Sequence, residues 1–158
     1  MTPTADLVDE HGDGAAVCEL DFRQYGGVRS FSGPIATVHC HEDNVLVRER
    51  ASEPGEGRVL VVDAGGSRRV ALVGDQIAGL AHANGWAGIV LNGCVRDAAS
   101  LTGIPLGLKA LGTNPRRSAK LGGGEVDVPV SFGGIEFAPG ALLYADDDGI
   151  VVITDASA

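Results

Sequence analysis

Residues 70–97, with the sequence VALVGDQIAGLAHANGWAGIVLNGCVRD, decide the fold. The apolar residues that open this stretch are typical of a buried strand, which Gly74 interrupts. From Asp75 onward, apolar residues recur at helical spacing until Asn84-Gly85, and residues 86–91 are again apolar and strand-like. The stretch therefore predicts a strand, a helix that begins at Asp75, and a second strand.

The rest of the chain continues this alternation in its middle and becomes richer in strands toward its end. Apolar periodicity and turn residues predict helices over 4–10, 46–51 and 98–101, and strands over 31–40, 59–62, 70–73, 86–91, 104–111, 126–132, 135–137, 142–144 and 150–153. This order favours the α/β class, with a mixed sheet and a β-rich C-terminal half. Residues 112–124 hold Arg116, Arg117, Lys120 and three consecutive glycines. The basic residues could contact substrate, a neighbouring subunit or only water, and we expect a solvated loop.

The composition limits the class of protein. The chain has 158 residues, of which 44% are apolar, so it can bury a core, and we expect one domain over residues 1–158. The formal net charge of −9 opposes a grip on a phosphate backbone, and we expect no direct binding of nucleic acid. No stretch approaches the ~20 apolar residues of a membrane span, and the acidic start of the chain is unlike a signal peptide. We therefore expect a soluble, cytoplasmic protein.

Two further motifs give weaker signals. The strand over 59–62 is followed by Asp63-Ala64-Gly65-Gly66, which is superficially similar to the opening of a nucleotide or S-adenosylmethionine site. Such a turn should lead into a helix, whereas here a second strand follows at once, so we interpret it as a hairpin-like turn. His39 and His41 could share a metal ion, but no further ligand has a convincing spacing, and we interpret them as structural.

The two strand-to-helix junctions of the opening stretch could form a site. The backbone amides of residues 74–77 begin a helix and can receive an oxyanion. At the second junction, Arg96 offers a planar fork for a carboxylate and Asp97 offers a hard oxygen ligand for Mg²⁺ or Mn²⁺. If the two strands are neighbours, both junctions lie at one edge of the sheet. The alternative is structural: Asp75 and Asp97 are good helix caps, and Arg96 could be a surface ion pair.

The whole chain, in order, resembles the RraA family, which groups regulators of ribonuclease E activity with class II aldolases of 4-hydroxy-4-methyl-2-oxoglutarate. The stretches that carry the resemblance are residues 22–27, 59–63, 71–75, 93–97, 132–134 and 144–150. Members with aldolase or oxaloacetate decarboxylase activity carry an Asp, twenty intervening residues and then Arg-Asp. Asp75, Arg96 and Asp97 reproduce this signature.

The resemblance implies an α/β/β sandwich of the phosphohistidine-domain type and a homotrimer with active sites between subunits. It implies a divalent cation, Mg²⁺ or Mn²⁺, on Asp97, with Asp75 and Arg96 as catalytic residues. A small 2-oxo acid would be bound by Arg96 and by the segment Gly74, Asp75, Gln76 and Ile77. The implied reactions are cleavage of 4-hydroxy-4-methyl-2-oxoglutarate to pyruvate and decarboxylation of oxaloacetate, both through a pyruvate enolate. The alternative is a non-catalytic protein that binds and inhibits a ribonuclease E-like enzyme.

Overall fold

The computed structural model describes residues 1–154, so positions 155–158 of the expected domain lie outside the described residues. Its helices are α1 (Thr4–His11), α2 (Val45–Ala51), α3 (Asp75–Ala83) and α4 (Ala98–Leu101), with a 3-10 turn, η1 (Gly12–Gly14). Its strands are β1 (Ala15–Val17), β2 (Arg23–Gln24), β3 (Phe31–His39), β4 (Val59–Asp63), β5 (Ala71–Val73), β6 (Gly88–Val95), β7 (Gly107–Thr113), β8 (Glu125–Val126), β9 (Val130–Phe132), β10 (Ile135–Phe137), β11 (Leu142–Asp146) and β12 (Gly149–Ile153). The helices and most strands agree with the sequence-based expectation, while the strand expected over 126–132 is divided into β8 and β9.

The strands form a large mixed sheet in which β3 takes part in two different pairings. The order is β1-β12-β11-β3-β4-β6-β7-β2, with β5 also on β6 and β8 also on β3. The first half of β3, Phe31 to Pro34, pairs antiparallel with β11. The second half, Ile35 to His39, pairs parallel with β4. Strands β4, β6 and β7 continue the parallel part, so β3 joins a parallel sheet to an antiparallel one.

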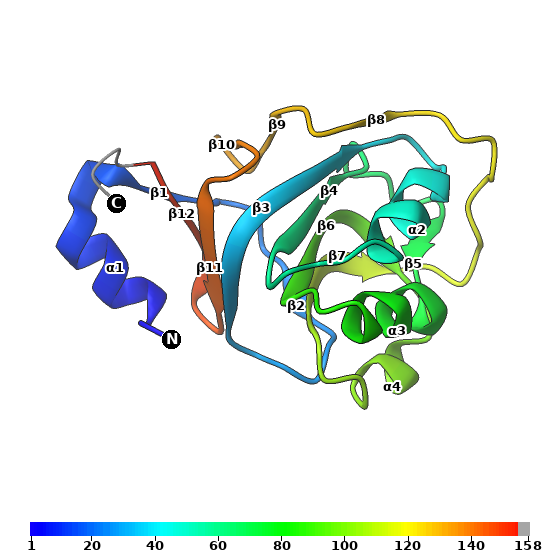
Figure 1. Ribbon diagram of the computed structural model, residues 1–158, viewed down its shortest axis with the longest axis horizontal. Coiled ribbons are helices and arrows are strands. Elements are labelled where there is room, and N and C mark those ends of the chain that lie inside the picture. The colour runs from blue at the N-terminus through cyan, green and yellow to red at the C-terminus, as the bar shows by residue number, and fades with distance from the viewer. Residues whose placement is uncertain (155–158) are drawn as a thin grey trace.

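The parallel sheet is buried on both faces, as the composition of β4 requires. Leu60 and Val62 pack into the cluster beneath α2, α3 and α4. Val59 and Val61 point to the other face and pack against residues of β11 and β12, because successive side chains of a strand alternate. Figure 1 shows the helices on one side of the parallel strands and the antiparallel strands on the other. The predicted α/β class with a mixed sheet is confirmed, and its layers form an α/β/β sandwich.

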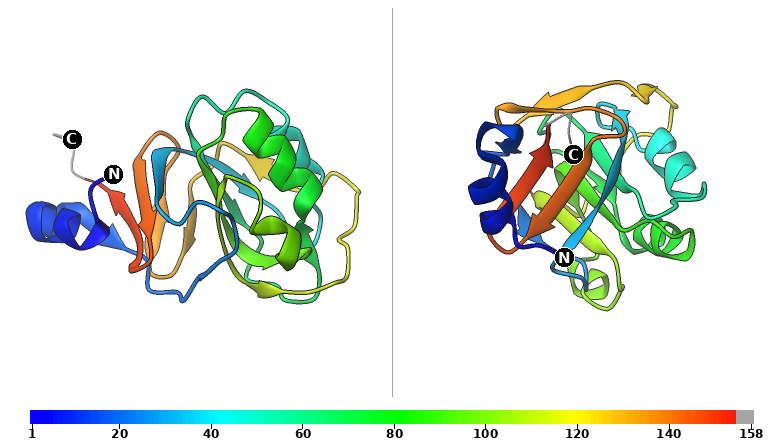
Figure 2. Two further views of the ribbon diagram at one scale, coloured as in Figure 1. Left: turned by 90° about the horizontal axis from the view of Figure 1, so that it is seen from below. Right: turned by 60° about the vertical axis from the view of Figure 1, so that its left-hand side comes forward.

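Helix α1 lies apart from the other helices and covers the outer face of the antiparallel strands. Leu7 is buried against Ala15, Val151 and Ile153. The views in Figure 2 place α1 at the opposite end of the molecule from α3. Thr4, at the start of the helix, donates its backbone amide and its hydroxyl to the carboxylate of Asp146, at 2.8 and 2.7 Å. The N-terminal helix is thereby tied to the turn between β11 and β12.

The prediction of a hairpin-like turn at residues 64–67 is wrong. The chain does not reverse there, since β4 and β5 both run parallel to β6 and follow one another along the same edge of it. The turn is a short detour held by Asp63, whose Oδ1 accepts the amide of Gly65 at 2.9 Å and the Nδ2 of Asn92 at 3.0 Å. The sequence spacing fits either geometry, and the pairing with the distant β6 decides between them.

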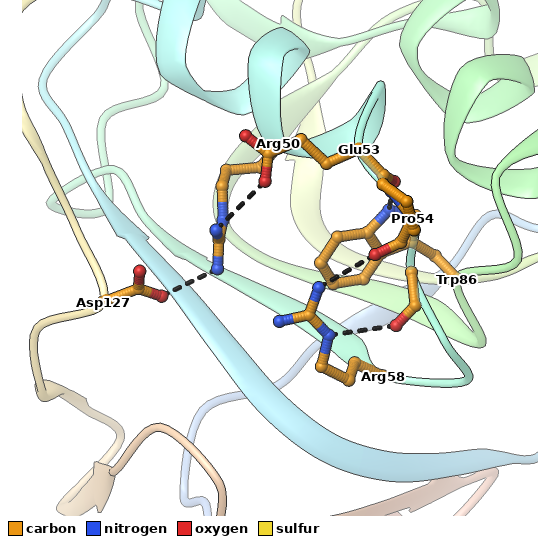
Figure 3. Close-up of polar contacts among 7 residues, drawn as sticks. Arg50, Glu53, Pro54, Arg58, Trp86 and Asp127 are labelled. Carbon is orange, nitrogen blue, oxygen red and sulfur yellow. Dashed lines mark hydrogen bonds and ion pairs between the residues drawn. The ribbon is translucent and has the colours of Figure 1, made fainter.

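A polar cluster closes the connection between α2 and β4 (Figure 3). Trp86, which is 4% exposed, donates its indole N–H to the carbonyl of Glu53 at 3.1 Å. The guanidinium of Arg58 lies 4.8 Å from the centre of the Trp86 ring and donates to the carbonyls of Pro54 and Gly55. Gly55 passes so close that a Cβ there would lie 2.5 Å from the backbone nitrogen of Trp86 and 2.6 Å from Cγ of its ring. The indole is therefore fixed from both sides.

We expect Trp86→Ala to lower the free energy of unfolding by about 3–5 kcal/mol, because it removes a large buried side chain and leaves a cavity. Arg58→Ala should cost about 1 kcal/mol, through the lost cation–π contact and packing. The control is Arg29→Ala, whose ion pair with Asp147 is exposed and should be worth less than ~1 kcal/mol. Urea denaturation measures all three. A loss below ~1 kcal/mol for Trp86→Ala would contradict this account of the cluster.

Candidate functional site

The two strand-to-helix junctions meet in space. Ala71 and Val73 of β5 pair in parallel with Cys94 and Val95 of β6. The amide of Arg96 then donates to the carbonyl of Val73 at 3.0 Å. Because neighbouring parallel strands end at the same edge of a sheet, the segments after β5 and β6 lie side by side. The expected juxtaposition of the two junctions is confirmed, whereas the roles of the individual residues stay predictions.

Asp97 connects the two junctions through one hydrogen bond. Its Oδ2 accepts the backbone amide of Asp75 at 3.1 Å, so its carboxylate satisfies one of the amides that begin α3. Asp97 itself has a left-handed backbone, with φ of 60°, and its side chain does not cap the helix that follows it. The structural alternative, in which Asp97 caps its own helix, is wrong. The backbone amides of residues 74–77 were expected to receive an oxyanion. The amide of Asp75 already donates to Asp97, so it is not available for a ligand.

Gly74 makes this contact possible. A Cβ at Gly74 would lie 2.6 Å from Oδ2 of Asp97 and 3.3 Å from Cγ of Arg96, distances that no side chain could occupy without displacing both. The glycine, interpreted from sequence as a strand interruption, therefore lets two side chains from the second junction lie over the start of α3. The amides of Gln76 and Ile77 belong to the same first turn, where an α-helix offers no acceptor four residues back.

These segments line a small cavity of about 80 Å³. Its walls include Gly74, Asp75, Gln76, Ile77, Arg96 and Asp97, which are all of the predicted site residues, together with Asn44, Arg48, Arg117 and Lys120. The wall thus carries four cationic side chains and two carboxylates, in a protein whose formal net charge is −9. An excess of positive charge in a concave polar site attracts anions.

The segment that follows β7 was expected to be a solvated loop, and the side chains of Arg117 and Lys120 are exposed as expected. Its backbone is bound along β5, since the amide of Ala71 donates to the carbonyl of Arg116 at 2.7 Å and Ala71 bridges to Arg117. This pairing places Arg117 and Lys120 in the cavity wall, although Arg116 does not line it. Sequence inspection found basic residues here but no local signal for the contact, because the partner strand lies more than forty residues away.

Asn44 links this segment to the sheet, and sequence analysis missed it. The side chain is buried; its Nδ2 donates to the carbonyl of Leu72 at 3.1 Å, and its Oδ1 accepts from the ammonium of Lys120 at 3.1 Å. Both ends of the amide are used, so Asn44 holds Lys120 beside β5. Asn44 lies at the N-cap position of α2, but its side chain makes no capping hydrogen bond.

Asp43 binds the backbone of the segment that follows β7. Its buried carboxylate accepts the amide of Val45 at 3.1 Å, of Leu121 at 2.6 Å and of Gly122 at 3.0 Å. Burial acts to raise the pKa of Asp43, but these backbone hydrogen bonds favour the charged form more strongly, and the net pKa is lowered. The ionised form of Asp43 therefore holds the glycine-rich end of the segment in place.

His39 and His41 are not part of a metal-binding cluster among the described residues. His39 is exposed at the end of β3, and His41 lies 3.7 Å from the carboxylate of Glu42. Among residues 1–154, no group of three or more His, Cys, Asp or Glu side chains is arranged to hold an ion. Cys18, Cys40 and Cys94 are buried and free. Within the described part of the chain, no helix is both long and apolar enough to cross a bilayer.

Comparison with known proteins assigns the fold to a family. The RraA-like family profile, described as Aldolase/RraA, matches residues 4–152. A solved structure from Geobacillus kaustophilus HTA426, named as an S-adenosylmethionine: 2-dimethylmenaquinone methyltransferase, shares 52% identity over 99% of this chain and 98% of its own, with a TM-score of 0.95.

Two further solved structures are similar. The RNA-processing inhibitor RraA of Thermus thermophilis shares 43% identity over 98% of this chain and 94% of its own, with a TM-score of 0.94. An unusual member of the RNase ES inhibitor RraA family from Streptomyces coelicolor shares 30% identity over 95% and 77% of the two chains, with a TM-score of 0.76.

We expect Asp43→Asn to lower the free energy of unfolding by about 1–3 kcal/mol at pH 7, because an amide nitrogen cannot accept the backbone N–H groups. The pKa of Asp43 is lower in the folded state than its ordinary value near ~3.9. The stabilisation by the wild-type carboxylate is therefore present above pH ~4 and is lost as the pH falls through the folded-state pKa. Urea denaturation at pH 7 and pH 3 measures this. Asp9→Asn, on the exposed side of α1, is the control, and equal stability of Asp43→Asn and wild type at pH 7 would refute the anchor.

Proposed function

The chain belongs to the RraA-like family, and on that basis we propose that it is a divalent-metal-dependent lyase. Its substrates would be small 2-oxo acids: it would cleave 4-hydroxy-4-methyl-2-oxoglutarate to pyruvate and decarboxylate oxaloacetate. The observation that carries the proposal is the meeting of Asp75, Arg96 and Asp97 in one cavity with further cationic side chains.

The charge of the cavity supports a substrate with more than one carboxylate. Arg96 and the 74–77 segment lie at the junctions, while Arg117 and Lys120 reach the cavity from the segment that follows β7. A substrate whose 2-oxo acid end lies at Arg96 would present its second carboxylate to Arg117 and Lys120. A planar guanidinium binds a carboxylate through two parallel hydrogen bonds, and an ammonium acts as a compact point charge.

The residues present fit a hydrated hard cation. Mg²⁺ usually keeps several waters and takes only one or two carboxylates from the protein, so the lack of a three-residue ligand cluster in the described residues is no obstacle. Asp97 is exposed at the cavity, and one of its oxygens is oriented by the amide of Asp75, which leaves the other free for an ion. Mg²⁺ or Mn²⁺ held there would act as a Lewis acid on the C2 carbonyl of the substrate.

The chain's own groups would do the rest. Arg96 binds the pyruvyl oxygens and stabilises the negative charge that develops on them as the bond between C3 and C4 breaks. The electron pair of that bond moves onto C3 and into the C2 carbonyl, which gives pyruvate enolate. In aldol cleavage, Asp75 orients a water molecule that removes the proton of the C4 hydroxyl, and C3 is then protonated. Oxaloacetate gives the same enolate by releasing carbon dioxide, so one site serves both substrates.

The assembly that we propose is a homotrimer with the active site between subunits. The cavity wall built by the 114–124 segment continues into Leu121, which is 90% exposed. A single exposed apolar side chain does not by itself mark an interface, and Leu121 supports this assembly because its segment also builds the wall of the open cavity. A neighbouring copy would then cover the open side of the cavity.

We expect pyruvate release from oxaloacetate to disappear in EDTA and to return with Mg²⁺ or Mn²⁺. Asp97→Ala should remain folded and lose roughly 10²–10³-fold or more in kcat, because it removes the proposed ligand of the cation from the site where charge develops. A coupled assay for pyruvate, with the melting temperature of each variant as the folding measure, tests both statements. Wild-type activity of Asp97→Ala would exclude Asp97 from the mechanism.

Two glycines of the same region provide a matched control. Gly74→Ala should displace Asp97 and Arg96 and reduce activity, since its Cβ has no room. Gly79→Ala, within α3, has nothing within 4 Å of the added Cβ, so it should leave activity unchanged and stabilise the helix by up to ~1 kcal/mol. Equal activity of the two variants would show that the 74–77 segment takes no part in the reaction.

The second candidate is a non-catalytic regulator that binds a ribonuclease E-like enzyme. It is favoured by the similarity to the RNA-processing inhibitor RraA and by the net charge of −9. Such a complex, formed with basic segments of a partner, would weaken as salt is added and would be indifferent to Arg96→Ala. A methyltransferase function is not proposed, because the glycine turn at 64–67 leads into β5 rather than into a helix whose amides could face a cofactor.

A further inference from the structure

Lys109 is a buried cation on the face of the sheet away from the proposed active site. Its neighbours on β7, Leu108 and Ala110, pack into the cluster beneath the helices. Since side chains alternate along a strand, Lys109 points to the opposite face, and the residue is only 4% exposed. Its ammonium has three donors. Within residues 1–154, the structure records neither a hydrogen bond nor an ion pair for it, only longer-range interactions with Asp146, Asp147 and Arg29.

This arrangement is unusual for a lysine. A buried charge without a partner is costly, and buried lysines are normally paired. Burial lowers the pKa of Lys109, while Asp147 and Asp146 act in the opposite direction without reaching it. The ammonium therefore has no hydrogen-bond acceptor among residues 1–154, and a bound ligand could supply one.

Lys109 opens into a cavity of about 190 Å³ that shares no residue with the candidate active site. The rest of the lining comes from residues 18–22 and from the turn between β11 and β12. Sites for cofactors and drug-sized ligands usually measure about 300–1,000 Å³. The cavity is therefore suited to a molecule about the size of an amino acid, and a nucleotide is too large for it.

A second buried group beside Lys109 also lacks a partner. Gln24 lies directly opposite Lys109 in the pairing of β2 with β7, so the two side chains lie on the same face of the sheet. Both N–H groups of its side-chain amide are used, because Nε2 donates to the carbonyls of Gly26 and Val28. Its Oε1 is buried with no donor. Gln24 does not itself line the cavity, so its unsatisfied oxygen marks the surroundings of Lys109 as incompletely hydrogen-bonded and is not counted as a ligand contact.

The mouth of the cavity has the opposite charge to its floor. Glu19, Asp21 and Asp148 line it and are exposed, while Asp147 is occupied by Arg29 at 2.9 Å. A dianion would be repelled by these carboxylates. A simple polyamine would satisfy them and leave the ammonium of Lys109 unpaired.

From this charge distribution we propose that the cavity binds an α-amino acid with a cationic side chain. The carboxylate of the ligand accepts from the ammonium of Lys109, and its cationic end lies among Glu19, Asp21 and Asp148 at the mouth. A ligand of this class satisfies the buried donor and the exposed acceptors together. The site is independent of the lyase proposal, since none of its residues takes part in that reaction.

The test is a titration calorimetry comparison of L-arginine with agmatine, which is the same molecule without its carboxylate. Wild-type protein should bind arginine at least roughly tenfold more tightly than agmatine, because only arginine provides the charged acceptor for Lys109. Agmatine that binds as tightly as arginine, or arginine that shows no binding at millimolar concentration, would overturn the proposal. This comparison needs no variant and does not depend on the folding of one.

Variants then assign the contacts. Lys109→Met keeps the length and burial of the side chain, so it should fold, and it should abolish the preference for arginine over agmatine. Asp148→Asn should weaken both ligands, whereas Asp13→Asn, an exposed acid outside the cavity, should change neither. A preference for arginine that survives in folded Lys109→Met would show that the carboxylate binds elsewhere, and would refute the site.

Discussion

The pairing of two successive strands along one edge of β6 is the constraint on which the rest of the structure depends. Strand β6 is buried along its whole length, with β7 on one side and first β4, then β5, on the other. Because β5 ends beside the end of β6, a guanidinium, two carboxylates and the start of α3 are brought within reach of one another. The detour at residues 64–67 is what allows β5 to take this position. The chemistry of the cavity is thus a consequence of strand register.

Charge is distributed unevenly over the molecule. The chain is acidic overall, yet four of its twelve lysines and arginines line one small cavity. Two of these, Arg117 and Lys120, are held there by the backbone of the 114–124 segment and by Asn44, rather than by carboxylates. Among residues 1–154 neither side chain forms an ion pair, so both charges are available to an anionic ligand. The match to a family described as Aldolase/RraA agrees with such a site.

The sequence predicted those features that depend on local pattern. The helix from Asp75 and the buried strand of β4 follow from apolar periodicity and composition, and the meeting of the two junctions follows from the rule that parallel neighbours end at one edge. It did not predict the path between β4 and β5, because the turn residues fit a hairpin as well as a detour. Nor did it predict Asn44 or Lys109 as notable residues. Both residues matter because of contacts between segments that lie far apart in the chain. The spacing of residues along the sequence does not reveal such contacts.

Strand β3 has a consequence for the way in which the two sheets move. Its first half belongs to the antiparallel sheet and its second half to the parallel sheet, with a continuous backbone between them. One continuous strand thus belongs to both sheets, so neither sheet can rotate or slide on the other unless β3 bends. The same strand contributes Phe31 and Ile35 to the buried cluster between the two sheets. Rigidity of this kind suits a protein that must keep groups from separate segments in fixed alignment.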